Sequence, residues 1–141
     1  MIFLACNGSG VMTNSQQAPT TISNIGVAMF TIADQDAAIA FYTQTLGWEK
    51  RADVPMGEGN RWVEVAPPGS TARLALNPPM GGTPGGGGIG VETPDVDAEH
   101  ARVSALEGVK VGDFMGGEGP VPKMFSIEDP DGNQIWVVQP D

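Results

Sequence analysis

The chain repeats one pattern of residues at an offset of about 61 positions. In the first copy, an apolar run at 27–32 precedes an Asp-rich cap and a stretch with apolar residues at helical spacing. The second copy has the same order at 89–108. A strand, an Asp cap, an amphipathic helix and a Gly stop are therefore predicted twice. Three pairs share the offset of 61: Asp34 and Asp95, Asp36 and Asp97, Gly47 and Gly108.

The repeat continues beyond both predicted helices. The tripeptide Gly57-Glu58-Gly59 returns as Gly117-Glu118-Gly119, and later runs with strand-like alternation and turn residues return in the same order. Each copy is therefore predicted to be a βαβββ module with its helix near 35–46 or 96–107. The later runs are 61–65 with 123–127, 67–69 with 129–131, and 74–78 with 136–140.

The module boundaries follow from the repeat. We expect a single α+β domain at 21–141, with module one at 24–78, module two at 89–140 and an extension at 1–20. Between the modules, 79–88 is rich in Gly and Pro and is predicted to be a flexible linker. A lone module has one sheet face covered by its helix and one bare face. The two tandem modules are therefore expected to form a curled mixed sheet around a ligand-binding cleft.

The composition limits the partners of the chain. With 7 basic and 17 acidic residues, its formal charge is −10, which disfavours nucleic acid and anionic membranes. No run approaches the 18 or so apolar residues of a membrane span. Cys6 is the only cysteine. Met1 to Ala5 is apolar but has no basic flank and is too short for a signal peptide, so we expect a cytoplasmic protein.

Several motifs together resemble the vicinal oxygen chelate superfamily, which includes glyoxalase I, extradiol dioxygenases and the fosfomycin- and bleomycin-resistance proteins. They are Asp34-x-Asp36, Ala40-Phe41-Tyr42, Leu46-Gly47-Trp48 and the turn Asp129-Pro130-Asp131-Gly132-Asn133. The resemblance covers about 24–140. It implies paired modules around a shared cleft, usually in a dimer, with a glyoxalase/bleomycin-resistance-like fold.

The resemblance also implies metal ligands, which this chain lacks at the matching positions. Enzymes of the superfamily hold a divalent metal with His, Glu or Gln on the first and last strands of each module. The matching residues here are Val27, Leu74, Gly88 and Trp136, none of which ligates a metal. The one histidine, His100, is expected to be a partly buried residue of the second helix. We therefore predict no metal and no cofactor, and assign no catalytic residue.

Strand alternation selects the candidate ligand-binding residues. Val63, Val65, Phe125 and Ile127 are predicted to face the helices, so their neighbours face the cleft. Tryptophans, methionines and carboxylates on that face suit a flat or cationic ligand. The tryptophans could instead serve core or dimer packing, and the glutamates could simply be solvated. The predicted set is Met29, Trp62, Glu64, Glu92, Met124, Ser126 and Trp136.

Three functions remain open from the sequence. The first is a metal-free protein that binds and sequesters a cationic or aromatic compound, as bleomycin-resistance proteins do in antibiotic resistance. The second is a lyase, isomerase or dioxygenase with a non-standard metal site, or an acid–base catalyst that uses Glu64 or Glu92. The third is a structural or regulatory subunit. A homodimer is expected because bare apolar sheet faces are rare on monomers.

Overall fold

The computed structural model describes residues 19–141. Most of the predicted extension, including Cys6, lies outside these residues. Within them, no helix is long and apolar enough to cross a membrane. The elements of module one are β1 (Val27–Thr31), α1 (Gln35–Ala40), η1 (Phe41–Thr45), β2 (Glu49–Gly57), β3 (Asn60–Ala66) and β4 (Arg73–Asn77). Those of module two are β5 (Gly88–Glu92), α2 (Val96–Ser104), β6 (Lys110–Val111), β7 (Met124–Glu128) and β8 (Gln134–Val138).

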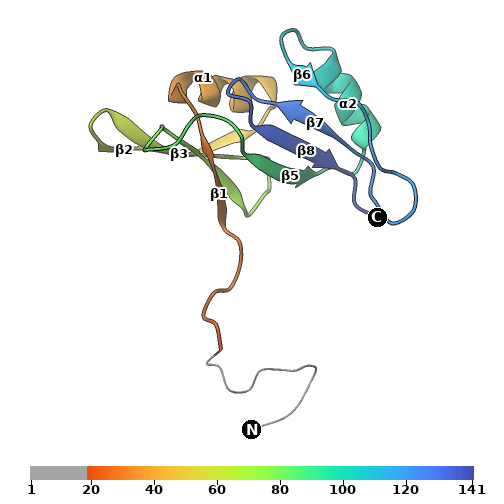
Figure 1. Ribbon diagram of the computed structural model, residues 1–141, viewed down its shortest axis with the longest axis horizontal. Helices are drawn as coiled ribbons and strands as arrows, with labels where there is room; N and C mark the ends of the chain where they lie inside the picture. Colours follow the sequence, from red (N-terminus) through yellow and green to blue (C-terminus); the bar gives the residue numbers. More distant parts are fainter. Residues whose placement is uncertain (1–18) are drawn as a thin grey trace.

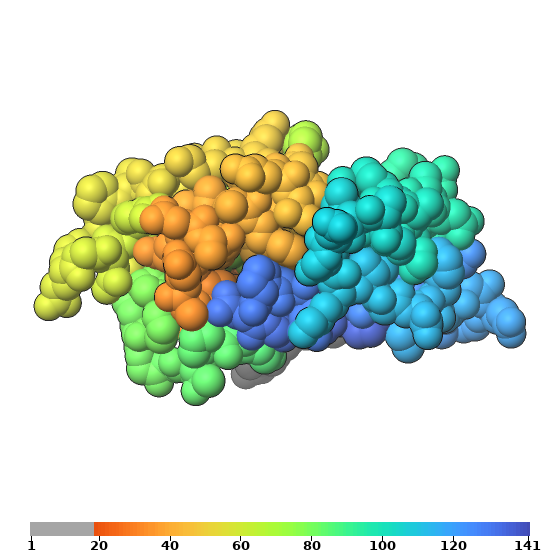
Figure 2. Space-filling model, turned by 90° about the horizontal axis from the view of Figure 1, so that it is seen from above, coloured from red at the N-terminus to blue at the C-terminus, as the bar shows by residue number. Residues whose placement is uncertain are grey.

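The two modules form two mixed sheets with the same topology. Sheet A has the order β1-β4-β3-β2, and sheet B has the order β5-β8-β7-β6. In each sheet the first strand of the module pairs in parallel with the last, and the other pairs are antiparallel. The predicted pair of βαβββ modules is confirmed, as two four-stranded sheets. Figure 1 shows the sheets side by side, and Figure 2 shows the two halves from above.

Both helices begin where the repeat indicates, whereas α2 ends at Ser104, three residues before the predicted end at 107. Asp34 Oδ1 accepts from the Ala37 N–H at 3.1 Å, and Asp95 Oδ1 accepts from the Ala98 N–H at 3.0 Å. These side chains cap helix N–H groups that have no partner within the helix. Helix α1 continues into the π-helical turn η1, in which Leu46 N donates to Phe41 O at 3.0 Å.

One hydrophobic core spans both modules. Val63, Val65, Phe125 and Ile127 are buried in it, as the alternation predicted. Both helices lie on the same side of the two sheets (Figure 1), so the opposite sheet faces are bare. We call these the open faces. On sheet A this face includes Met29, 59% exposed, and Val54, 51% exposed.

The buried polar turn that contains Asp129 and Asn133 joins module two to module one by hydrogen bonds. The Tyr42 hydroxyl donates to Asp129 Oδ2 at 2.9 Å, and Asn133 Nδ2 donates to the same oxygen at 3.0 Å. Asn133 Oδ1 in turn accepts from the Gly87 N–H at 2.9 Å, which fixes the end of the linker. A Cβ at position 87 would lie 2.7 Å from the Phe30 ring, so this close approach requires glycine.

Candidate functional site

The open face of sheet A carries three of the predicted ligand-binding residues. Met29 and Glu64 are both Cα partners of Ala75 on β4, so they share a row across the sheet. Trp62 lies two residues before Glu64 on the same face of β3 and donates from Nε1 to Glu64 Oε2 at 3.0 Å. The sequence prediction therefore placed Trp62 and Glu64 correctly on one surface.

Arg73 is a member of this surface that the sequence analysis missed. Its Nε lies 2.9 Å from Glu64 Oε1, in an ion pair whose side chains are 39% and 13% exposed. Both carboxylate oxygens of Glu64 are thus engaged, one by Arg73 and one by Trp62. The alternation of β4 around Ala75 would have identified Arg73, but only once the register of β3 and β4 was known. The negative charge of Glu64 is therefore compensated within the chain.

The open face of sheet B carries the other four predicted residues. Trp136 has Gly90 as its Cα partner on β5 and Ser126 on β7. Val138, in the next row, has Glu92 and Met124 as its partners. A Cβ at Gly90 would meet no atom within 4 Å, so the strand beside Trp136 leaves open space. Trp136 is the aromatic centre of this face.

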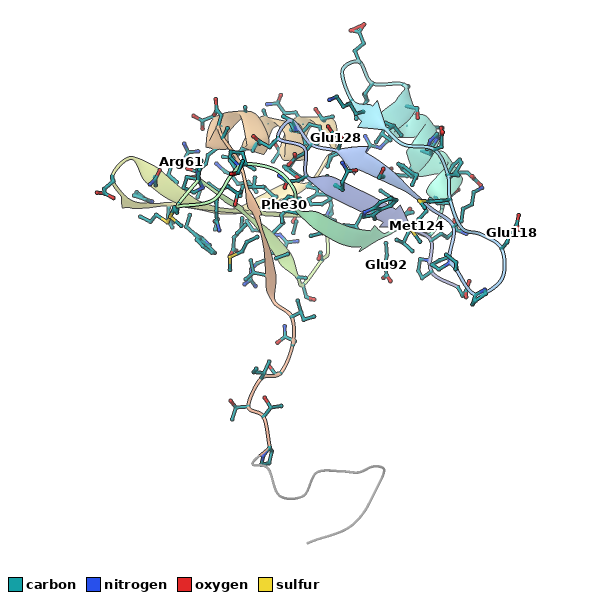
Figure 3. The ribbon with its side chains drawn as sticks, viewed as in Figure 1. Phe30, Arg61, Glu92, Glu118, Met124 and Glu128 are labelled. Atoms are coloured by element: carbon teal, nitrogen blue, oxygen red, sulfur yellow. The ribbon has the colours of Figure 1, made fainter. Side chains whose placement is uncertain are left out.

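Glu92 differs from Glu64 in having a free carboxylate. It is exposed, and among the described residues it forms no ion pair. Figure 3 shows its side chain projecting away from β5. On β5, Glu92 lies two residues beyond Gly90, the partner of Trp136, and so on the same face as Trp136. A carboxylate and an indole ring are therefore diagonal neighbours across β5 and β8.

The two sets belong to separate sheets of the chain. Met29, Trp62 and Glu64 lie on sheet A, whereas Glu92, Met124, Ser126 and Trp136 lie on sheet B. The shared core joins the helix-covered sides, while the open faces lie away from it. The predicted residues therefore form two separate surfaces, one on each sheet.

The positions that would hold a metal in related enzymes do not fit one. The register corrects one of them, because Leu74 packs in the hydrophobic core, whereas Ala75, itself buried, shares a row with Met29 and Glu64 on the open face. The corrected set is Val27, Ala75, Gly88 and Trp136, which offers no ligating side chain. Among residues 19–141, no group of three His, Cys, Asp or Glu side chains is arranged to hold a metal ion.

A groove runs along the seam between the modules, and we call it the seam groove. Its larger lobe, about 770 Å³, lies between the turn after β3 and strand β5. Its smaller lobe, about 400 Å³, reaches Arg102 on α2, where the hydrogen-bonded Glu99 carboxylate raises the pKa of that guanidinium. The residues common to both lobes are Trp48, Pro67, Pro68, Val91 and Glu92.

His100 has structural contacts on α2. Its Nε2 lies 3.2 Å from the Gly112 carbonyl oxygen. Its ring centroid lies 4.3 Å from that of Phe114 and 4.8 Å from that of Phe125. The side chain thus holds the segment after β6 against the helix, as expected for a partly buried helix residue.

Several proteins of known structure have folds similar to this one. The structure is similar to TnmS3, an antibiotic binding protein from Streptomyces sp. CB03234, with a TM-score of 0.75, 34% identity and coverage of 87% of this chain and 100% of that one. It is also similar to a lactoylglutathione lyase from Agrobacterium tumefaciens, with a TM-score of 0.66, 26% identity and coverage of 85% and 96%.

A curated relative covers a shorter stretch. The uncharacterized protein YetH of Bacillus subtilis (strain 168) is 40% identical over 57 residues, which are 40% of this chain. The chain thus spans about half, 48%, of the length of that relative. The model of the glyoxalase/bleomycin resistance protein/dioxygenase superfamily matches residues 24–137, which covers both modules. The chain therefore belongs to the glyoxalase/bleomycin resistance protein/dioxygenase superfamily.

Proposed function

We propose that this protein binds a planar, positively charged small molecule without a metal and thereby sequesters it. The observation that carries the proposal is the Trp136–Glu92 arrangement on the open face of sheet B. The indole lies beside a glycine on β5, and the free carboxylate lies on the same face. An aromatic face attracts a cation by about 0.5–2 kcal/mol, depending on its exposure to water.

We assign the preference for positively charged ligands to Glu92 alone, and not to both Glu64 and Glu92. Glu64 already pairs with Arg73, so it adds little net charge to its surface. Glu92 remains free, and the chain has a formal charge of −10. An acidic surface of this kind favours the approach of cations.

The comparisons support binding as the general activity. The similar protein TnmS3 is an antibiotic binding protein. A metal-free site is supported by the four positions that would hold a metal. Their residues, Val27, Ala75, Gly88 and Trp136, have no side chain that ligates one. The ligand class proposed here, a cationic aromatic compound, rests on the side chains of the two open faces.

The proposal includes a homodimer in which a second copy completes the site. Within one chain, the Trp62 surface and the Trp136 surface lie on open faces of different sheets, away from the shared core. Sheet A of one copy placed opposite sheet B of the other would form a cleft between the two tryptophans. A two-fold axis would produce two such clefts per dimer. The exposed Met29 and Val54 side chains would then be covered.

A thermal-shift screen at several protein concentrations, together with analytical ultracentrifugation, tests this proposal. We expect a species of twice the 14.7 kDa chain mass at micromolar concentration. Planar cations should stabilise it, by about 2.7 kcal/mol for a ligand at 100 times its dissociation constant. Proflavine and anthraquinone-2-sulfonate serve as cationic and anionic probes of similar shape. Stabilisation by the anion alone would contradict the proposal, and turnover of a bound compound would favour the enzyme hypothesis.

A further inference from the structure

Asn77 is the last residue of β4, and its side chain belongs to the open face of sheet A. Its Cα partner on β1 is Thr31, and Ile32 N donates to Asn77 O at 2.8 Å, so the parallel ladder continues to this residue. Ala75, two residues earlier, shares a row of the open face with Glu64. Because side chains alternate along a strand, Asn77 faces the same side. The sequence analysis missed this residue.

The amide oxygen of Asn77 is buried without a hydrogen bond. Among residues 19–141, no donor lies within hydrogen-bond distance of Asn77 Oδ1. Most buried polar atoms in proteins have a partner, because an unpaired acceptor lowers the stability of the folded state. A donor group on a bound ligand would supply the partner that the chain itself does not provide.

The two neighbours of Asn77 in its row do not serve as that partner. The register places Asn77 between Thr31 on β1 and Trp62 on β3. The indole N–H of Trp62 donates to Glu64 Oε2 at 3.0 Å and is therefore already engaged. Thr31 lies against the linker, where a Cβ built on Gly82 would be 3.6 Å from Thr31 Oγ1. An acceptor therefore remains free beside an aromatic ring.

Strands β3 and β4 separate where Trp62 and Asn77 lie. Their direct pairing ends two residues before Asn77. Beyond that point the side chain of Gln35 bridges the strands from α1. Its Nε2 donates to Arg61 O at 2.6 Å and to Leu76 O at 3.0 Å, and its Oε1 accepts from the Arg61 N–H at 3.2 Å. The indole of Trp62 and the amide of Asn77 thus flank the part of the sheet where a side chain joins the two strands.

We propose that Asn77 Oδ1 accepts a hydrogen bond from an N–H or O–H group of the bound ligand. The Trp62 surface then selects planar cations that carry such a donor on the edge of the ring. This inference rests on the proposed function and specifies the class of ligand within it. Neighbouring strands lie about 5 Å apart, so a ring stacked on Trp62 brings its edge to Asn77.

Charge alone does not make this selection on sheet A. Glu64, the carboxylate nearest to Trp62, is paired with Arg73 at 2.9 Å. A neutral amide oxygen selects by hydrogen bonding instead, since a ligand without a donor leaves the oxygen unpaired. Sites built to bond an N–H or O–H group reject analogues that lack this group.

Calorimetric titration with two planar cations of similar size tests this inference. Proflavine carries two ring amino groups, whereas 10-methylacridinium carries a permanent charge and no N–H group. The unsubstituted protein should bind proflavine about tenfold more tightly, as expected for one added hydrogen bond to a charged ligand. Asn77→Leu, which is similar in size but has no acceptor, should lose most of this preference. Because the two probes carry the same charge, the ratio of their affinities is insensitive to net charge.

Two further variants serve as controls. Asn77→Asp retains an acceptor oxygen at the same position, so it should keep the preference for proflavine. It also provides the measurement if Asn77→Leu does not fold. Gln44→Leu removes an exposed amide from η1 and should leave the preference unchanged.

The outcomes separate the role of Asn77 from the proposed function. Equal affinities of the two probes for the unsubstituted protein would overturn the role of Asn77 and leave the proposed function in place. An unchanged preference in Asn77→Leu, or its loss in Asn77→Asp, would do the same. If neither probe binds the unsubstituted protein, the proposed function fails, and the role of Asn77 fails with it.

Discussion

The Tyr42 hydroxyl donates a hydrogen bond of 2.9 Å to Asp129 Oδ2, although the two residues are 87 positions apart. Tyr42 is fully buried, and Asp129 is only 3% exposed. The other oxygen of Asp129 accepts from the N–H groups of Asp131 and Asn133 at 2.9 and 2.8 Å. One tyrosine thus ties the π-helical turn of module one to the last turn of module two.

Tyr42→Phe should lower the free energy of unfolding by about 1.5–3 kcal/mol, because a buried hydrogen bond to a carboxylate is lost. Urea denaturation followed by circular dichroism measures this. Thr43→Val is the matched control, since it removes a neighbouring hydroxyl that bonds only to Ile39 O within its own helix. Equal midpoints for Tyr42→Phe and the unsubstituted protein would show that the bond does not stabilise the module junction.

The same tyrosine predicts a loss of stability at high pH. Burial and the nearby Asp129 carboxylate raise the pKa of Tyr42 above its ordinary value of 10. Below pH 10 both the folded and the unfolded states keep the proton, so the stability is unaffected. Above pH 10 the unfolded state releases the proton first, which favours unfolding with a slope approaching 1.4 kcal/mol per pH unit.

Urea titrations between pH 8 and 11 test whether the stability falls above pH 10 as predicted. Tyr42 is the only tyrosine in the chain, so its ionisation can also be followed by ultraviolet absorbance. The unsubstituted protein should lose stability more steeply than Tyr42→Phe above pH 10. Parallel curves for the two proteins would contradict the prediction, because lysine ionisation affects both proteins alike.

The sequence predicted the repeated elements well because their signals are local. Asp34 and Asp95 cap the helices through N–H groups three residues away. Strand alternation likewise placed Val63 and Phe125 in the core. The position assigned to Leu74 was wrong by one residue, because Ala75 rather than Leu74 lies on the open face. The turn before β4 differs in length from the turn before β8, and alternation alone does not fix the register.

The site was only partly predictable, because its contacts join distant segments. The Arg73–Glu64 pair depends on the register of β3 against β4. The separation of Trp62 and Trp136 on two sheets depends on how the modules pack, which no spacing in the sequence reports. The seam groove likewise forms between residues such as Pro67 and Val91 from different modules.

The Arg73–Glu64 pair predicts the effect of removing the arginine. Arg73→Gln should leave the Glu64 carboxylate uncompensated and increase the affinity for proflavine about fivefold, since a charge at about 4 Å contributes about 1 kcal/mol even in water. Lys50→Gln is the control, because it makes the same change in net charge at the surface pair with Asp53. Calorimetric titration gives both affinities. A larger gain for Lys50→Gln would assign the effect to net charge.

The side chains at the usual metal positions predict a metal-free protein. Protein purified without chelators should contain well under one transition metal per chain by elemental analysis. Binding of proflavine should then be unchanged by dialysis against EDTA. One tightly held zinc, nickel or iron ion per chain would contradict this prediction and favour the enzyme hypothesis.

The most direct test of the proposed ligand site is a calorimetric titration of proflavine into Trp62→Ala, Trp136→Ala and the control Phe114→Ala. Phe114 is a partly exposed aromatic residue beside His100, so its loss controls for aromatic truncation elsewhere. Each tryptophan variant should bind about tenfold more weakly, as expected for a lost cation–π contact of about 1–2 kcal/mol, and the control should bind normally. Unchanged affinity in both tryptophan variants, or tighter binding of anthraquinone-2-sulfonate than of proflavine, would contradict the proposed cation-binding site.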